Sequence, residues 1–376
     1  MAGAGIGGTT AAAALAHDGF EVVLLERASN LDHVAVGGGI HLWPNGQKAL
    51  GYLDGRDQAL RDELDADARL KRASFETFRG GRLVRWDTHA TLSVLRGTLH
   101  RHLRDALPAG AVRTDSAVVR YEEHGDGVTV VLGGGETVDA DALVAADGVR
   151  STVRGQLLAD GPPRYAGYST WTAVVDTEHP TAPPGLFRIL FGRGARFVYY
   201  HVGQSKVYWE ATVALPEGGS DAPGGHRDAL LPHFDDFAEP TTAFISATDE
   251  SAIVRGDIYD RPPTKTWVSG RVALLGDAAH PMTNALGQGA NQAMEDAIVL
   301  ADSLKGAPEL GAALLDYQRR RVPRANRMVT LSHRLAWMHM WRSRPAVAAR
   351  TAMLRTVGPF AVNATRKDAM RDFLAT

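Results

Sequence analysis

Two spacings of hydrophobic positions alternate along the first 160 residues, one typical of helices and the other typical of strands. Small and apolar residues at helical spacing predict helices over 9–17, 46–53 and 96–107. Apolar or alternating runs predict strands over 20–26, 116–123, 127–132 and 142–146. Because helices and strands take turns, we expect an α/β fold in which helices cover a sheet.

The middle of the chain has a different pattern, in which strand-like runs follow one another and helical spacing is scarce. The strands predicted there are 168–175, 187–191, 197–201 and 207–213. We interpret this region as an antiparallel sheet inserted between two halves of the α/β domain. A buried strand at 271–275 and a helix at 290–305 resume the α/β pattern, and the chain beyond Tyr317 is expected to be helical. The predicted domains are a discontinuous α/β domain (1–160 and 266–325), a β-sheet domain (161–265) and a C-terminal helical segment (326–376).

Composition excludes several classes of protein. Among 376 residues, 44% are hydrophobic and 22% are charged, which is typical of a folded globular chain. Lys and Arg number 41 against 43 Asp and Glu, so we expect no nucleic-acid partner. Cysteine is absent, which excludes disulfides and thiolate metal sites, and we assign no metal site. Without a visible secretory signal or a bilayer-spanning apolar stretch, we expect a cytoplasmic monomer or homodimer with no stable membrane insertion.

The first motif that carries chemistry is a glycine-rich turn at the start of the chain. Gly3, Gly5 and Gly8 match G-x-G-x-x-G, and Glu26 follows at the spacing expected for ribose binding. Gly3 allows a tight turn, Gly5 lets a pyrophosphate approach the backbone, and Gly8 lets helix and strand pack closely. A strand should precede Gly3, and only two residues stand there, so we expect the sequence as given to begin a few residues late. Because NAD-dependent dehydrogenases share this motif, it is weak evidence alone.

Two glycine–acid motifs follow predicted strands farther along the chain. Asp147-Gly148 comes directly after one strand, and Gly276-Asp277 comes directly after another. A glycine-rich turn at 287–291 then precedes a predicted helix. The start of that helix presents free N–H groups and a positive dipole end.

In this order and spacing, the three motifs resemble those of the group A FAD-dependent aromatic hydroxylases, which are flavoprotein monooxygenases. The resemblance covers residues 3–327. Within the family, 164–171 and 276–280 are similar to the urate hydroxylases, and 39–45 is similar to the 6-hydroxynicotinate hydroxylases. The resemblance implies a Rossmann-like FAD-binding domain of the GR2 type, an inserted antiparallel β-sheet substrate domain and C-terminal helices.

The resemblance also implies how the chain would hold FAD. Glu26 would bind the adenosine ribose, Arg96 the pyrophosphate or ribityl region, and Asp277 the ribityl hydroxyls. The turn at 287–291 would place backbone N–H groups at the flavin pyrimidine edge and stabilise negative charge there. The residues that the resemblance assigns to FAD are Gly3, Gly5, Gly7, Gly8, Glu26, Arg27, Arg96, Val118, Asp147, Asp277, Gly287, Gly289, Ala290 and Asn291.

The reaction that the resemblance implies is oxygen transfer to a small aromatic or heteroaromatic substrate. NADH or NADPH would reduce FAD, and O₂ would form a C4a-hydroperoxide that hydroxylates or epoxidises the substrate. Arg196 and Tyr208 match in spacing an Arg and a Tyr that meet the substrate in urate hydroxylases, and His41 matches an active-site His of the hydroxynicotinate enzymes. Arg196 would hold an anionic or carbonyl oxygen, and Tyr208 or His41 would polarise or deprotonate a hydroxyl. The structural alternatives are a surface Arg, a core Tyr and a His that caps a strand.

One position departs from the family pattern. Where the family has a proline beside the reactive flavin carbon, this chain has Asn284. Because of this replacement, one alternative to a monooxygenase stays open, namely an FAD-dependent oxidase or reductase of the same fold that inserts no oxygen. An NAD-dependent dehydrogenase is disfavoured by the two glycine–acid motifs. We also expect the arginine-rich segment 319–324 to be a solvated helix start and the segment 337–341 to pack between helices.

Overall fold

The computed structural model describes residues 1–32, 38–64, 66–221 and 224–374. The sequence also predicts a loop over 32–41, and its residues 33–37 lie outside the described part of the chain. The helices are α1 (Ile6–His17), α3 (Pro44–Gly51), α4 (Arg56–Glu63), α5 (Arg96–Arg104), α6 (Thr152–Leu158), α7 (His226–Phe234), α8 (Thr241–Ala247), α9 (Gly289–Leu304), α10 (Leu310–His339), α11 (Arg344–Thr356) and α12 (Gly358–Ala369). The strands are β1 (Leu24–Leu25), β2 (Gly39–Leu42), β3 (Arg69–Thr77), β4 (Arg82–Leu95), β5 (Val112–Arg113), β6 (Val118–Glu123), β7 (Val128–Leu132), β8 (Thr137–Ala140), β9 (Leu143–Ala145), β10 (Arg164–Asp176), β11 (Leu186–Phe191), β12 (Ala195–His201), β13 (Lys206–Val213), β14 (Val254–Asp260), β15 (Val268–Ser269) and β16 (Val272–Leu274).

A small, largely parallel sheet surrounds the first residues of the chain. β1 pairs in parallel with β5, and β9 pairs in parallel with β16. Ala2 forms parallel bridges to Leu25 of β1 and to Ala145 of β9, so it stands between the two pairs, where the sequence predicts a central strand. The strand predicted over 20–26 is shortened to β1, in which Leu24 pairs with Val112 and Leu25 with Arg113.

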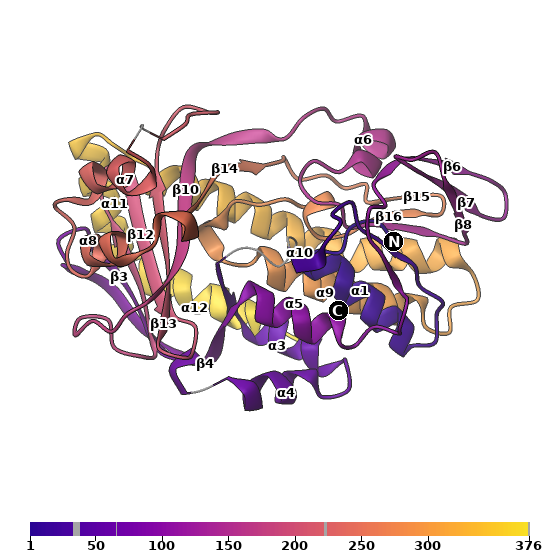
Figure 1. Cartoon of the computed structure of the whole chain (residues 1–376), viewed down its shortest axis with the longest axis horizontal. Coiled ribbons are helices and arrows are strands. Elements are labelled where there is room, and N and C mark those ends of the chain that lie inside the picture. The colour runs from indigo at the N-terminus through magenta and orange to yellow at the C-terminus, as the bar shows by residue number, and fades with distance from the viewer. Residues whose placement is uncertain (33–37, 65, 222–223, 375–376) are drawn as a thin grey trace.

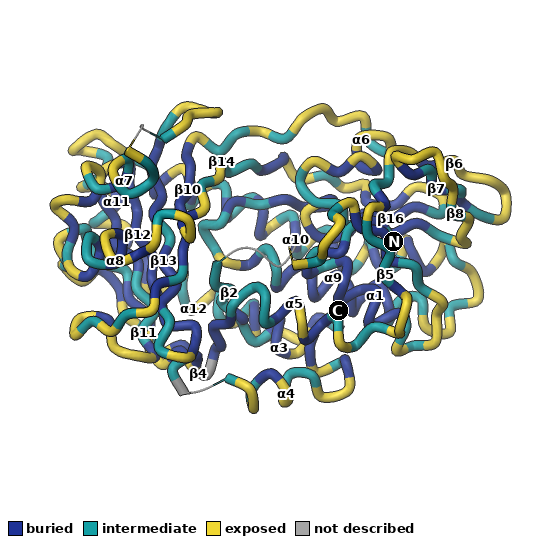
Figure 2. The backbone as a smooth tube through the Cα atoms, in the orientation of Figure 1, coloured by how far each residue is buried: buried dark blue, intermediate teal, exposed yellow. Residues whose placement is uncertain are grey.

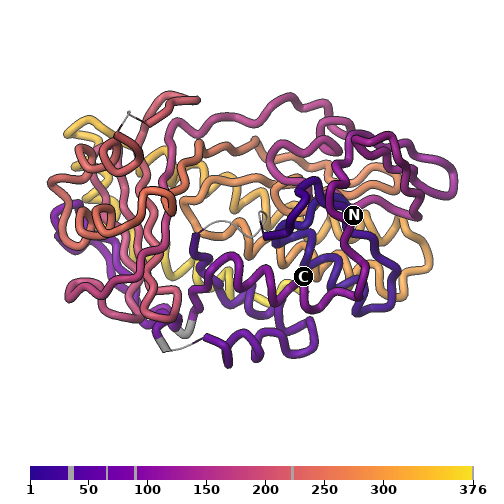
Figure 3. The backbone as a smooth tube through the Cα atoms, viewed as in Figure 1, coloured from indigo at the N-terminus to yellow at the C-terminus, as the bar shows by residue number. Residues whose placement is uncertain are grey.

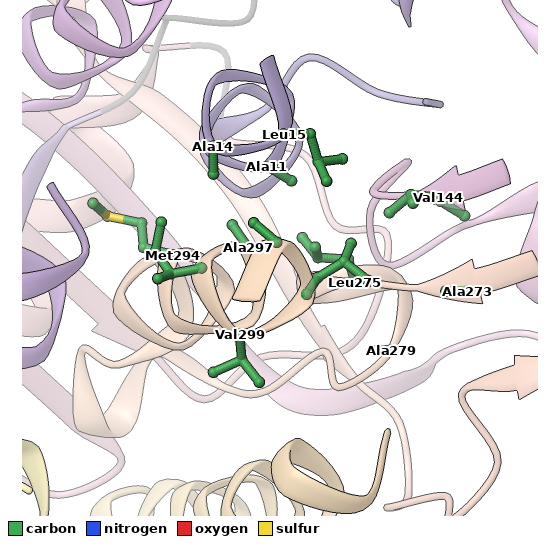
Figure 4. Packing of buried hydrophobic residues seen from close by; sticks show 14 of the residues in the cluster. Ala11, Ala14, Leu15, Val144, Ala273, Leu275, Ala279, Met294, Ala297 and Val299 are labelled. Atoms are coloured by element: carbon green, nitrogen blue, oxygen red, sulfur yellow. The ribbon is translucent and has the colours of Figure 1, made fainter. Parts of the chain in front are cut away.

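Helices α1 and α9 pack against each other beside this sheet. Figure 4 shows Ala11 and Ala14 of α1 facing Met294 and Ala297 of α9, with Leu275 alongside. The small side chains let the two helix backbones approach closely, as a densely packed core requires. The packing fixes the starts of both helices relative to the sheet.

The second layer is an eight-stranded sheet with the order β14-β10-β13-β12-β11-β3-β4-β2, counted over the described residues. Its neighbours are antiparallel except for β11 and β3, which are parallel. The region 161–265 supplies β10 to β14, whereas β2, β3 and β4 come from 39–95, which the sequence division places in the α/β domain. Figure 3 shows the purple segment of β3 and β4 on the same side of the molecule as the pink and red segments of β10 to β13. The domain boundaries therefore stay a prediction, but the sheet itself is wider than 161–265.

The two faces of this sheet have different partners because side chains alternate along each strand. Phe197 of β12 and Trp209 of β13 pack with α7 and α8. Val198 and Tyr200 of β12 and Tyr208 of β13 belong to a second cluster on the opposite face, together with residues of α10 and α11. The second face is the one that turns toward the small parallel sheet (Figure 1).

The C-terminal helices join the two layers. α10 begins at Leu310, before the predicted boundary at 326, and contacts α9, β15 and β10 along its length. α11 and α12 lie against β4. Trp337, which the sequence predicts to pack between helices, is exposed. At the other end of the molecule, many residues of the β6–β8 meander are also exposed (Figure 2). Among the described residues, no helix is both long and apolar enough to cross a membrane.

Candidate active site

One cavity of about 710 Å³ lies between the parallel sheet and the inner face of the eight-stranded sheet. The lining on the first side includes Gly5, Gly7, Arg96, Asp277, Gly289 and Ala290. The lining on the second side includes His41, Phe187, Arg196, Tyr200, Tyr208 and Glu210. Some of the residues predicted to hold a cofactor thus face the same continuous space as the three residues predicted to meet a substrate.

The glycines at 3–8 differ in whether the surrounding structure leaves space for a side chain. Gly3 has φ +94°, and a Cβ there would lie 2.5 Å from the Ala146 carbonyl oxygen. A Cβ at Gly8 would lie 1.9 Å from the Gly3 carbonyl oxygen. A Cβ at Gly5 would meet nothing within 4 Å, and Gly5 lines the cavity. The turn therefore closes tightly on itself and opens its backbone at Gly5, as close approach of a pyrophosphate requires.

Two acidic residues of the predicted cofactor site brace backbone turns. Glu26 accepts hydrogen bonds from the backbone N–H groups of Ala4 (2.8 Å) and Ala28 (2.9 Å), which fixes the glycine turn against the end of β1. Asp147 accepts from the backbone N–H of Thr152 (2.9 Å) at the first turn of α6. The predicted residues that do not line the cavity are Gly3, Gly8, Glu26, Arg27, Val118, Asp147 and Asn291.

Asp277 and Arg96 form the charged part of the cavity wall. Burial raises the pKa of the Asp277 carboxyl, while His280 and Arg96 oppose that shift. Burial lowers the pKa of the Arg96 guanidinium, and Asp277 opposes that shift in turn. The two groups stabilise each other's charged forms, so the wall offers one acceptor and one cation to a polar ligand.

The start of α9 forms the next part of the wall. Gly287 has φ +62°, a conformation that suits glycine, and it reverses the chain just before α9 begins. Asn291 accepts a hydrogen bond from the backbone N–H of Trp43 (3.0 Å) and donates to the carbonyl oxygens of His41 (3.0 Å) and Gly287 (3.2 Å). Asn291 therefore ties the turn to β2 and α3, and the free N–H groups of a 16-residue helix face the cavity.

A buried ion-pair network supports this wall from below. The guanidinium of Arg321 on α10 donates to Asp296 (2.6 Å) and Glu295 (2.5 Å) of α9. Asp296 also accepts from the Gly276 backbone N–H (2.9 Å) and pairs with His280 (2.5 Å). Burial alone would raise the pKa of Asp296, but His280 and Arg321 outweigh it and hold the pKa below its usual value. The prediction that 319–324 is solvated is wrong for Arg321, because both carboxylates lie on the facing helix.

On the substrate side of the cavity, β12 and β13 carry a polar group of side chains made of Arg196, Tyr208 and Glu210. Arg196 is 2% exposed, which rules out a surface Arg, and its guanidinium pairs with Glu210 and contacts the Thr212 hydroxyl oxygen at 3.3 Å. The Tyr208 hydroxyl donates to Glu210 at 3.5 Å. Burial and Glu210 raise the pKa of Tyr208 well above its usual value, so its hydroxyl keeps its proton near neutral pH and acts as a donor.

His41 lies inside β2 rather than at its end, at the edge of the same cavity. Its Nε2 is 2.9 Å from the Thr91 hydroxyl oxygen, and its ring lies near the rings of Trp43 (4.8 Å between centroids) and Phe187 (5.1 Å). Burial lowers the pKa of His41 to about 3. The imidazole is therefore neutral near pH 7 and can orient or polarise a ligand.

Comparison with known proteins decides the family. A family model described as an FAD binding domain matches residues 1–183 and 246–332. The aurachin C monooxygenase/isomerase of Stigmatella aurantiaca is 38% identical over 98% of this chain and 96% of its own length. The FAD-dependent urate hydroxylase of Klebsiella pneumoniae is 34% identical over 87% of this chain and 86% of its own length. The chain belongs to the class A flavoprotein monooxygenases.

The fold of this flavoprotein monooxygenase is also found among solved structures. The crystal structure of Klebsiella pneumoniae HpxO complexed with FAD and uric acid matches it with a TM-score of 0.89 at 30% identity, over 98% of this chain and 95% of HpxO. The predicted fold class is thereby confirmed. The zeaxanthin epoxidase of Solanum lycopersicum is 36% identical, and this chain spans about half (48%) of that relative's length.

The residues of this flavoprotein monooxygenase fit an FAD isoalloxazine in the cavity. Four side-chain N–H donors that line it have no hydrogen-bond partner among the described residues: Trp43 Nε1, Asn284 Nδ2, Gln288 Nε2 and, on β12, Arg196 Nε. The carbonyl oxygens and ring nitrogens of a flavin are acceptors of the matching kind. Asn284 accepts from the Tyr168 hydroxyl (2.8 Å), which fixes the orientation of its amide.

Proposed function

We propose that this flavoprotein monooxygenase uses NADH or NADPH and O₂ to oxygenate a small aromatic or heteroaromatic ring that carries an oxygen substituent. The observation that carries the proposal is the single cavity shared by Gly5, Asp277 and Gly289 on one side and by Arg196 and Tyr208 on the other. FAD bound there supplies the chemistry of O₂ activation next to the substrate.

The polar side chains of β12 and β13 would orient the substrate. Arg196 would hold an anionic or carbonyl oxygen, since a guanidinium forms charge-assisted hydrogen bonds to such groups. Tyr208 would donate a hydrogen bond to the same end of the ring and raise its electron density by stabilising the ionised form of a substrate hydroxyl. His41, which is neutral, would polarise rather than deprotonate. Phe187 and Tyr200, stacked at 5.3 Å between centroids, would position the ring and exclude water.

The cofactor wall would stabilise charge that develops on the reduced ring. The start of α9 directs N–H groups and a positive dipole end into the cavity, where they favour negative charge. Arg96 and Asp277 would hold the polar chain of FAD, and Gly5 would contact its pyrophosphate. The relatives include a urate hydroxylase and a zeaxanthin epoxidase, which supports oxygen insertion over the oxidase and reductase alternatives.

Oxygen labelling tests this function. The FAD-loaded protein is mixed with NADH or NADPH under ¹⁸O₂ and with single candidate rings, starting with uric acid and salicylate and extending to hydroxylated pyridines and quinolines. We expect at least one ring to stimulate NAD(P)H oxidation at least about tenfold and to gain one labelled oxygen atom. Oxidation that yields only hydrogen peroxide or an unlabelled product for every stimulating ring would contradict the proposal and favour the oxidase or reductase alternative.

A further inference from the structure

The C-terminal helices present an exposed apolar surface outside the cavity. Of the nine large hydrophobic side chains that are exposed among the described residues, five lie between Trp337 and Met370. Three of these are Met353 (40% exposed), Val357 (54%) and Phe360 (76%), which we call the α11–α12 surface. Backbone hydrogen bonds that span four residues flank Val357 on both sides, so the three side chains have the spacing of neighbours on one helical face.

The surroundings of this surface are strongly basic. Residues 326–376 contain nine Lys and Arg and two Asp and Glu, whereas the whole chain contains 41 and 43. Arg355, Lys367 and Arg371 are exposed on or beside α11 and α12. Both acidic side chains of this segment are already in ion pairs with basic ones. The segment that carries the apolar side chains therefore has an excess of positive charge, which favours an anionic partner.

We propose that the α11–α12 surface docks on the anionic face of a lipid bilayer. Met353, Val357 and Phe360 would enter the boundary between headgroups and acyl chains, and the basic side chains would contact anionic headgroups. A second copy of the chain is a poorer occupant, because a twofold interface sets the same basic patch against itself. The helices would lie on the bilayer, in keeping with the lack of a spanning helix among the described residues.

The opposite side of the same helices faces the cavity. Leu354 of α11 and Gly358 and Val362 of α12 line it, next to Trp86 of β4 and Leu335 of α10. Docking therefore places an apolar wall of the cavity beside the acyl chains of the membrane. An apolar substrate would gain a short route from lipid to the cavity, and this consequence rests on the proposed function, whereas the docking itself does not.

Vesicle co-sedimentation tests the docking with the FAD-loaded full chain. The probes are vesicles of phosphatidylcholine alone and of phosphatidylcholine with phosphatidylglycerol, at low and at high salt. We expect binding to the anionic vesicles only, weakened by salt because the basic residues act through screened charges. The double substitution V357S/F360S should lower the partition coefficient at least about tenfold, since two exposed apolar side chains are lost from the interface.

A matched variant separates this surface from exposed apolar residues in general. Leu315 on α10 is 55% exposed, which is close to the exposed fraction of Val357 (54%). In sequence, Leu315 lies far from the α11–α12 surface. L315S should bind anionic vesicles as the unaltered chain does, and both variants should keep their FAD. The proposal is overturned if the unaltered chain stays in the supernatant with anionic vesicles, if V357S/F360S binds as well as L315S, or if V357S/F360S instead converts a dimer to a monomer in light scattering.

Discussion

Arg196, Tyr208 and Glu210 form one hydrogen-bonded group on the cavity wall, in which Glu210 contacts both other side chains. The spacing of Arg196 and Tyr208 predicts that both side chains lie near a substrate, and the structure places both on the cavity wall. The sequence did not indicate Glu210, which contacts both of them. The register of β12 against β13, with Arg196 opposite Thr212, brings this carboxylate beside the guanidinium. That register depends on the turn that joins the two strands, which the predicted strand ranges alone do not specify.

Replacement of Arg196 by Gln should weaken substrate binding. Loss of a charge-assisted hydrogen bond is worth about 1.5–3 kcal/mol, so we expect KM for an anionic substrate to rise at least about tenfold while FAD content is unchanged. The matched control is R188Q, because Arg188 forms an ion pair with Glu76 on the same sheet, has a side chain that is 13% exposed, and does not line the cavity. Equal effects of the two substitutions on KM would contradict the role of Arg196.

His41 should make the protein sensitive to acid. Its pKa is about 3 in the folded chain and about 6.5 when exposed, so the unfolded chain binds one more proton between these values. Stability is therefore complete above pH 6.5 and falls as the pH drops toward 3, by up to about 1.4 kcal/mol per pH unit. We measure the free energy of unfolding by chemical denaturation from pH 4 to 8. In H41N this free energy should change less with pH than in the unaltered chain or in H124N, which alters an exposed residue. An unchanged slope in H41N would refute this.

At the scale of elements, the glycine turn illustrates a local pattern that determines its own structure. Gly3, Gly5 and Gly8 are three backbone positions whose spacing alone predicts a turn and a helix start, and α1 begins within the motif at Ile6. The buried network between α9 and α10 is the opposite case. Asp296 and Arg321 are 25 positions apart, and the sequence shows neither as buried, since only the packing of two helices brings them together.

Two alanine substitutions in the glycine turn should have different effects. G8A puts a Cβ against the Gly3 carbonyl oxygen at 1.9 Å, so it should lower the melting temperature and the yield of folded protein. The Cβ of G5A meets nothing within 4 Å, so without FAD this variant should melt like the unaltered chain. It should weaken FAD binding at least about tenfold, because its Cβ occupies the path of the pyrophosphate. FAD affinity and thermal melting are measured for both. Full FAD affinity in G5A would contradict the assigned path.

The support of α9 by α10 can be tested with neighbouring ion pairs. D296N leaves the guanidinium of Arg321, the His280 ring and the Gly276 N–H with a weaker partner in a buried site, so we expect a loss of about 3–5 kcal/mol in unfolding free energy. D302N breaks the partly exposed pair with Arg320 on the same two helices and should cost less than about 1 kcal/mol. Similar midpoints of urea unfolding for the two variants would show that the network does not stabilise the fold.

At the scale of the whole molecule, the sequence predicts both layers but not how the chain divides between them. After residue 160, the strand-like runs of apolar residues are clear enough to predict β10 to β13, and the structure contains these strands. β3 and β4 went unrecognised because charged residues interrupt their alternation, as at Arg69, Lys71 and Arg72. These strands complete the eight-stranded sheet and carry Phe75 and Trp86 into the cavity, so the substrate wall is built from two distant parts of the chain.

The central claim is that the cofactor loops and the inner face of the eight-stranded sheet enclose the flavin ring and the substrate in one cavity. A crystal structure of the chain with FAD tests it most directly. We predict electron density for the isoalloxazine against the turn at 287–290, with its open side toward Arg196 and Tyr208. A flavin ring bound outside this cavity, or one separated from the eight-stranded sheet by protein, would contradict the account.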